Sequence, residues 1–303
     1  MDGVNTIDHT GFVTENLVRA EKWYEKVFGA QVLFRTHLST ADRKKGYVPF
    51  TFVNMGGHRY ELCLALDEFL PPNDSVHILP RIAFEVSDRE MDRAPKVLEA
   101  NEVPFDGPVD RSDLPNVSRT LLLLDPDGNV TELCTRKTDG APVPEGAEDG
   151  PIRIGRISHM VLEATDLDVT ERFYERGLGL DPLGRSSVNG GQPVVTLRTA
   201  TGQLFQFAKV DALSGRSLFR AGADSSPVPD PTPGTPYRYK GAHTAVSVAS
   251  PEAYQRVYKA IPEYGGFDEG DHRAALRGPA EQSTYFYDPS GNRLQLIIVP
   301  GKH

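Results

Sequence analysis

The sequence predicts an α+β protein of two tandem domains, and three observations carry that prediction. Residues 9–29, HTGFVTENLVRAEKWYEKVFG, align without a gap with residues 159–179, HMVLEATDLDVTERFYERGLG. Near the end of each copy, LLLLDPDGNVTEL at 121–133 matches TYFYDPSGNRLQL at 284–296. Each copy also contains two successive cycles of a strand, a helix and further strands. We therefore expect four β-α-β-β-β modules, two in each domain.

The spacing of the matching segments sets the expected domain boundaries. The offset is 150 residues in the first match and 163 in the second, so the second copy contains additional residues. We place them in the run 214–236, which is rich in proline and glycine. The segment DGAPVPEGAEDGP, residues 139–151, is poor in apolar residues and is predicted to be a linker. The predicted domains are residues 1–138 and 152–303.

The first module begins with a short strand that contains His9, and an amphipathic helix follows it. The apolar residues of this helix recur at helical spacing and share one face: Leu17, Ala20, Tyr24, Val27 and Phe28. Asn16 and its counterpart Asp166 are expected to cap the helix N-termini, and Gly29 and Gly179 to cap the C-termini.

The remaining elements follow in the same order. Further strands are expected at 61–66, 81–86, 205–210, 243–248 and 294–299. Two more helices are expected, one over 90–100 and one that begins at Ser250 and Pro251, since proline suits the first helical turn.

The bulk composition restricts the classes of function. Hydrophobic content of 39% and charged content of 25% are typical of a soluble globular protein, and no apolar run is long enough to span a membrane. A net charge of -9 without a basic cluster argues against nucleic acid and anionic lipid as partners. The two cysteines, Cys63 and Cys134, and a start without a secretory leader favour the cytoplasm. A homodimer is left open.

The repeated motifs resemble those of a known family. The segment H-x6-[ND]-L-x5-[FW]-Y-E-x3-G occurs at 9–29 and 159–179, and a D-P-x-G-N turn precedes the last strand of each copy. In both features the chain resembles the vicinal oxygen chelate superfamily of glyoxalases, bleomycin- and fosfomycin-resistance proteins and extradiol dioxygenases. The resemblance implies that paired modules form cupped mixed sheets with helices outside. It also implies that metal ligands come from the first and last strands of each module.

These strand positions carry different side chains in the four modules. The first-strand positions are His9, Arg81, His159 and His243, and the last-strand positions are Glu61, Glu132, Gln206 and Gln295. Both orders of pairing occur in the family. If neighbouring modules pair, no pocket contains two histidines and a carboxylate. If modules 1 and 4 pair, one pocket gathers His9, Glu61, His243 and Gln295. We favour this crossed pairing, because imidazole and carboxylate suit a divalent ion.

The resemblance then assigns roles to individual residues. His9, Glu61, His243 and Gln295 are the candidate metal ligands, and the implied ion is Fe(II) first, with Mn(II), Zn(II) or Ni(II) as alternatives. Tyr285 and Glu61 are the candidate catalytic residues, although Tyr285 would also suit simple packing. In the other pocket, we expect the guanidinium of Arg81 to replace a cation and pair with Glu132, and His159 to keep a hydrogen-bonding role.

Three functions are compatible with these assignments. The first is a metal-dependent extradiol-type dioxygenase that cleaves a catecholic or hydroquinone-like aromatic ring. The second is a glyoxalase-like lyase or isomerase with a divalent metal, for which Gln295 is better suited than for a strict two-histidine, one-carboxylate site. The third is a metal-free protein that binds an aromatic metabolite or antibiotic. In each case the expected partner is a small aromatic or vicinal-dioxygen compound.

Overall fold

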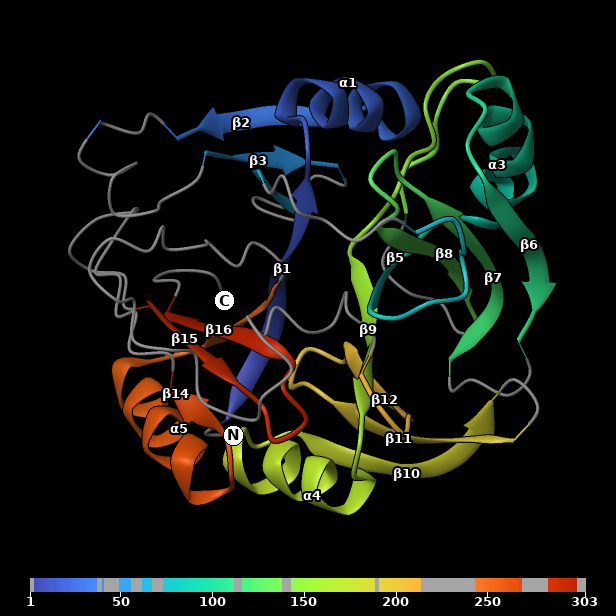
Figure 1. Ribbon diagram of the computed structural model, residues 1–303. Coiled ribbons are helices and arrows are strands. Elements are labelled where there is room, and N and C mark those ends of the chain that lie inside the picture. The colour runs from blue at the N-terminus through green and yellow to red at the C-terminus, as the bar shows by residue number, and fades with distance from the viewer. Residues whose placement is uncertain are drawn as a thin grey trace. The chain divides into compact units, whose positions relative to one another are not determined.

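A computed structural model of the chain contains the four predicted modules (Figure 1). It describes residues 3–36, 40, 49–55, 62–66, 73–111, 116–137, 143–188, 191–213, 243–268 and 283–298. The predicted insertion 214–236, the linker residues 139–142 and the candidate ligand Glu61 lie outside the described residues.

Each module consists of a strand, a helix and three further strands. Module 1 contains β1 (Val4–Thr14), α1 (Leu17–Phe28), β2 (Gln31–Arg35), β3 (Phe50–Asn54) and β4 (Leu62–Leu66). Module 2 contains β5 (Arg81–Glu85), α3 (Asp88–Ala100), β6 (Phe105–Asp110), β7 (Val117–Leu124) and β8 (Val130–Arg136). Module 3 contains β9 (Ile157–Ala164), α4 (Leu167–Arg172) with the π-helical turn η1 (Phe173–Gly177), β10 (Asp181–Val188), β11 (Gln192–Arg198) and β12 (Leu204–Lys209). Module 4 contains β13 (His243–Val248), α5 (Pro251–Glu263), β14 (Phe267–Asp268), β15 (Ser283–Tyr287) and β16 (Arg293–Ile298).

The helix boundaries lie where the sequence predicts them. The Asn16 side chain accepts a hydrogen bond from the Arg19 N–H, and Asp166 caps α4 in the same way. Gly29 and Gly179 follow the helices with φ of 66° and 74°, a left-handed conformation that glycine adopts without strain. Each helix packs on strands of its own module, as α5 does on β13, β14 and β16.

The strands form two mixed eight-stranded sheets, which confirms the predicted fold class. One has the order β14-β15-β16-β13-β1-β4-β3-β2, and the other β10-β11-β12-β9-β5-β8-β7-β6. In modules 1, 2 and 4 the first and last strands run parallel. β1 therefore lies beside the first strand of module 4, and β9 beside that of module 2. Of the two pairings that the sequence leaves open, this is the crossed one.

The chain divides into two compact units, and their boundaries do not coincide with those of the two copies of the repeat. The described part of unit 1 consists of residues 3–9 with the part of modules 3 and 4 that follows residue 160. The described part of unit 2 consists of residues 10–160, again with gaps. Both β1 and β9 thus begin in one unit and end in the other.

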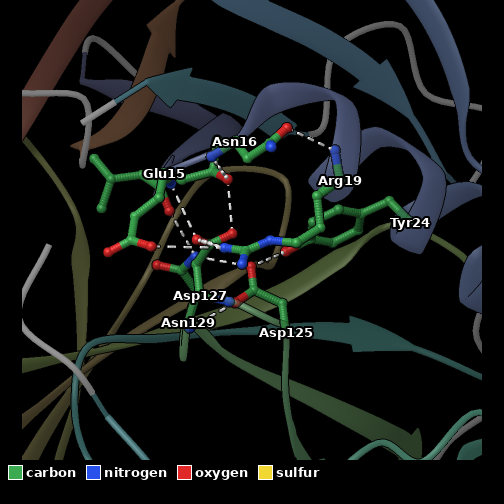
Figure 2. A network of polar contacts seen from close by, with 9 residues as sticks. Glu15, Asn16, Arg19, Tyr24, Asp125, Asp127 and Asn129 are labelled. Atoms are coloured by element: carbon green, nitrogen blue, oxygen red, sulfur yellow. Dashed lines mark hydrogen bonds and ion pairs between the residues drawn. The ribbon is translucent and has the colours of Figure 1, made fainter. Parts of the chain in front are cut away.

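A buried carboxylate fastens the two modules of unit 2 together (Figure 2). Asp125, in the D-P-D-G-N turn, accepts hydrogen bonds from the Tyr24 hydroxyl of α1 at 2.9 Å and from the Asn129 side chain at 2.7 Å. Its other oxygen accepts from the backbone N–H groups of Asp127 and Asn129. Asn129 in turn donates to the Val13 carbonyl in β1, at 2.9 Å. The two sequence motifs of the repeat are therefore the two halves of one network.

The same network recurs in unit 1. Asp288 accepts from the Tyr174 hydroxyl at 3.1 Å and from the Asn292 side chain at 2.8 Å, and Asn292 donates to the Glu163 carbonyl at 2.8 Å. Burial raises the pKa of Asp288 to about 6, against the lowering effect of the hydrogen bonds from Asn292 and Tyr174. The pKa of Asp125 is likewise raised to about 6, so both carboxylates are ionised at neutral pH.

Part of the predicted linker is fixed to unit 2 through helix α3. The buried Glu90 carboxylate accepts hydrogen bonds from the N–H groups of Gly146 and Arg153, at 2.8 and 2.7 Å. The Arg93 guanidinium donates to the carbonyls of Gly150 and Pro151. These contacts give residues 146–153 a defined path despite a composition that is typical of a flexible segment.

We predict that Asp125→Asn destabilises the chain by about 2–3 kcal/mol, because the new amide group would face hydrogen-bond donors that the carboxylate now accepts. Urea denaturation measures the difference. The control is Asp110→Asn in the same module, where the side chain is exposed and the expected change is below about 0.5 kcal/mol. Equal stability of the two variants would contradict a fastening role for Asp125.

Candidate metal centre and active site

The centre of the candidate site is a pair of buried imidazoles in unit 1. His9 lies on β1 and His243 is the first residue of β13, and their side chains converge although they are far apart in the sequence. The two Nε2 atoms are 3.2 Å apart, and the rings meet edge to face with centroids 5.2 Å apart. His9 is 1% exposed and His243 6%. The predicted meeting of these two histidines is confirmed.

Asp8 orients the His9 ring. One of its carboxylate oxygens lies 2.8 Å from His9 Nδ1, and the Asp8 side chain is buried. An ionised carboxylate only accepts hydrogen bonds, so it requires a proton on Nδ1. In a neutral ring this leaves the lone pair on Nε2, the atom that faces His243. A carboxylate behind a histidine in this way is the usual support of a metal-binding imidazole.

Strand register places Gln295 and Tyr285 on the same face of the sheet as His243. Gln295 pairs with Tyr285 on β15 and with Ala245 on β13, two residues after His243. The Gln295 amide donates to the Ser283 hydroxyl at 2.7 Å. Its carbonyl oxygen, Oε1, is buried and has no hydrogen-bond partner among the residues that the structure describes. A buried carbonyl oxygen of this kind is costly unless it acquires a partner, which a cation would supply.

Tyr285 lies between His243 and Arg293. Its ring meets the His243 ring edge to face at 5.4 Å, and the Arg293 guanidinium lies over it, 4.1 Å from the centroid. Both Tyr285 and Arg293 are buried. The contact with Arg293 is a cation–π interaction, which fixes the orientation of the phenol ring beside the histidine pair.

These donors fit a divalent ion. Two nitrogens that bind one ion at roughly 2.0–2.1 Å are about 2.9–3.4 Å apart when the angle at the ion lies between the octahedral and tetrahedral values. The observed separation of 3.2 Å lies in this interval. Among the described residues the two imidazoles converge, Gln295 Oε1 lies on the same face of the sheet, and no three His, Cys, Asp or Glu side chains gather. The anionic ligand predicted for this site, Glu61, lies outside them.

The corresponding positions in unit 2 carry an ion pair. The Nε atom of Arg81 is 2.8 Å from one Glu132 oxygen, which confirms the predicted contact. The Nε2 atom of His159 is 3.4 Å from the other oxygen, and its Nδ1 atom is 3.2 Å from the Ser158 hydroxyl. The opposite charges of Arg81 and Glu132 dominate this cluster, since within the described residues neither Glu132 oxygen has a hydrogen-bond partner of good geometry.

The charge of Arg81 determines the protonation of this cluster. Burial alone would raise the pKa of Glu132, but the positive charge of Arg81, assisted by His159 and Arg111, outweighs it and lowers the pKa to about 2. Glu132 is therefore an anion at neutral pH although it is completely buried.

The fourth ligand position predicted for the second pocket, beside Arg81, Glu132 and His159, is Gln206. It is buried on β12 and belongs to unit 1.

The comparison with protein families agrees with the motifs and with the geometry. A family model described as Glyoxalase/Bleomycin resistance protein/Dioxygenase superfamily matches residues 6–133 and 156–296. The chain belongs to this superfamily. Its members typically use divalent metals, and the two matched ranges correspond to the two copies of the repeat.

Solved structures with the same fold include superfamily members of different activities. A putative dioxygenase from Bacillus subtilis is 15% identical with a TM-score of 0.68, over 98% of this chain and 86% of that one. Glyoxalase I from Zea mays is 16% identical with a TM-score of 0.62, over 96% of this chain and 92% of that one. At such low identity these similarities establish the fold only.

Three residues of the site have no clear signal in the sequence. Asp8 precedes His9 on the same strand, and a regular strand would turn adjacent side chains to opposite faces. Arg293 does not stand at a ligand position of its module, although a single residue separates it from Gln295 and both lie on one face of β16. Ser283 is recognisable only once the register of β15 and β16 is known.

Among the described residues, no helix is both long and apolar enough to cross a membrane.

We predict that the stabilising contribution of Glu132 depends on pH. Because its pKa is lowered in the folded chain, the contribution is present above the ordinary value of 4.5 and disappears as the pH falls toward about 2. The stability difference between the wild type and Glu132→Gln should therefore shrink by about 2 kcal/mol from pH 6 to pH 3. Urea titrations at several pH values measure it. Glu99→Gln, at an exposed position, should show no such trend, and a constant difference for Glu132→Gln would refute the ionised state.

Proposed function

We propose that the chain is a mononuclear metal-dependent enzyme of the extradiol type, which cleaves a catecholic or hydroquinone-like ring with O2. The observation that carries this proposal is the pair of buried Nε2 atoms of His9 and His243, 3.2 Å apart, with Tyr285 packed against His243. In this proposal the two imidazoles would hold a divalent ion, and the neighbouring phenol group of Tyr285 would move a proton.

The residues that would hold the ion are His9, His243 and Gln295 through Oε1, together with Glu61 as the anion. Fe(II) suits the histidine and carboxylate donors and the use of O2, and Mn(II), Zn(II) or Ni(II) are alternatives. When bound, the ion supplies Lewis acidity toward two neighbouring substrate oxygens and, as Fe(II), access to O2. Ring cleavage would break one carbon–carbon bond of the ring beside a hydroxylated carbon, and both atoms of O2 would enter the ring-opened product.

The side chains around the histidine pair have separate roles in this proposal. The Tyr285 hydroxyl would relay the proton that a substrate hydroxyl releases, accepting it while it donates its own proton onward to a product oxygen. Arg293 holds the Tyr285 ring through the cation–π contact at 4.1 Å. Asp8 holds the proton on His9 Nδ1, so that Nε2 stays available inside the site.

A glyoxalase-like lyase or isomerase is the second candidate, and the amide at position 295 favours it. A neutral carbonyl oxygen in place of a second carboxylate suits a four-donor site of His9, His243, Gln295 and Glu61. In such an enzyme Glu61 would be the group that moves the substrate proton. This reaction needs no O2, and oxygen consumption therefore separates the two candidates.

We predict that the wild-type chain binds one divalent ion and that His9→Ala and His243→Ala each weaken this binding at least about 100-fold, because each removes a direct ligand. Metal analysis after reconstitution with Fe(II), Mn(II) or Zn(II) measures it. His159→Ala and the exposed His77→Ala are the controls and should retain the ion. A wild-type chain that binds none of these metals would favour the metal-free binding function.

We predict oxygen consumption when the Fe(II)-loaded chain is mixed with members of a catechol and hydroquinone panel. Tyr285→Phe should lower kcat about 10²–10⁴-fold while the metal content is unchanged, since it removes the group that transfers the proton but no ligand. An oxygen electrode and metal analysis of the same samples give both values. A metal-loaded chain that consumes no O2 with any member of the panel would favour the lyase or isomerase.

A further inference from the structure

We propose that Gln203, in the turn between β11 and β12, is a positioning residue for His9. Its side chain holds the main chain of Ile7, two residues before His9 on β1, although the two are 196 positions apart in the sequence. The consequence for metal binding rests on the proposed function, whereas the effect on the histidine pair does not.

The Gln203 amide makes three hydrogen bonds to residues that precede His9. Its oxygen accepts from the Ile7 N–H at 2.6 Å and from the Thr6 hydroxyl at 2.5 Å. Its Nε2 group donates to the Ile7 carbonyl at 3.1 Å. The amide thus satisfies both backbone groups of Ile7, as a neighbouring strand would.

The turn that presents Gln203 is itself fixed. The Gln203 N–H donates to the Thr199 hydroxyl at 3.1 Å, and the Thr199 N–H donates to the Gln203 carbonyl at 2.9 Å. The Thr201 N–H donates to the Asn5 carbonyl at 3.1 Å, and thereby extends the contact to the start of β1. Gln203 is 5% exposed, so these bonds form away from solvent, where the loss of one is expensive.

The contact acts on β1 close to His9. Among the described residues, the ladder between β1 and β4 covers Thr10–Thr14, and β13 is the neighbour of β1 on its other side. At Ile7 the Gln203 side chain takes the role of a strand partner. Ile7 and His9 lie on the same side of β1, so a shift of the Ile7 backbone moves the imidazole with it. A metal site tolerates a misplacement of only about 0.5 Å in its ligands.

The chemistry of the amide explains why glutamine is suited to this place. It presents an acceptor and a donor side by side, as the Ile7 N–H and carbonyl require. A glutamate of the same length would keep the bonds from Ile7 N–H and Thr6 but would turn an oxygen toward the Ile7 carbonyl. A methionine would fill the space and make none of the three bonds.

The test compares Gln203→Met and Gln203→Glu with Gln192→Met in the full chain. Gln192, on β11, also makes an amide hydrogen bond, to the Lys209 carbonyl at 3.0 Å, and this bond joins β11 to β12 and not to β1. Urea denaturation shows whether the three variants are folded and how much stability each has lost. The glutamate variant, which keeps two of the three bonds, serves if the methionine variant does not fold.

Two readouts distinguish a positioning role from general stability. In the metal-free chain, nitrogen chemical shifts of the His9 and His243 imidazoles report the contact between the two Nε2 atoms. In the loaded chain, calorimetric titration with Zn(II) reports affinity. In both Gln203 variants we expect the imidazole nitrogen shifts of His9 and His243 to differ from those of the wild type. We also expect these variants to bind Zn(II) about 10–100-fold more weakly, whereas Gln192→Met should change the affinity less than about 3-fold.

The outcomes separate this inference from the proposed function. Unchanged imidazole shifts in folded Gln203 variants would overturn the positioning role whatever the metal affinity. A wild-type chain that binds no Zn(II), Mn(II) or Fe(II), but whose imidazole shifts change in the Gln203 variants, would support the positioning role and reject the metal enzyme. Equal losses in Gln192→Met and Gln203→Met would show that general stability, and not Gln203, sets the geometry.

Discussion

Strand β1 is the element on which the candidate site depends, because its first half belongs to unit 1 and its second half to unit 2. Residues 3–9 precede the rest of module 1 in the sequence, but they pack with modules 3 and 4. The Val4 N–H donates to the Leu178 carbonyl at the end of η1, and the Gln203 amide holds Ile7. Within unit 1, His9 then lies beside His243.

The equivalent strand positions of the repeat carry different side-chain charges in the two units. In unit 1 the positions are filled by the imidazoles of His9 and His243, whose Nε2 atoms face one another across 3.2 Å. In unit 2 the guanidinium of Arg81 occupies a first-strand position and neutralises Glu132. A permanent positive charge excludes a second cation from the same place, so an internal ion pair takes over the stabilising role. What both units retain is the fastening of the D-P-x-G-N turn to the helix tyrosine, as in Asp125 with Tyr24.

The sequence predicts the modules, the helix caps and the crossed pairing, because these depend on local patterns and on charge. The resemblance supplies the ligand positions that pair His9 with His243, and the charges at these positions favour that pairing. The roles of Asp8 and Gln203 are not predicted. Alternation along a strand would turn the neighbours Asp8 and His9 to opposite faces, and the partner of Gln203 is 196 positions away, where no periodicity connects them. Nor does composition reveal that Glu90 fixes residues 146–153, since a segment of low hydrophobicity also becomes ordered when buried polar groups bind its backbone.

In the proposed function the metal centre lies at His9 and His243, and no ion binds beside Glu132. Anomalous diffraction from crystals grown with Mn(II) tests it directly, because the signal locates the ion without reference to activity. The account predicts one peak per chain, about 2.1–2.2 Å from the Nε2 atoms of both His9 and His243. A peak beside Glu132 and His159, or the absence of any peak in crystals soaked with an excess of the metal, would contradict it.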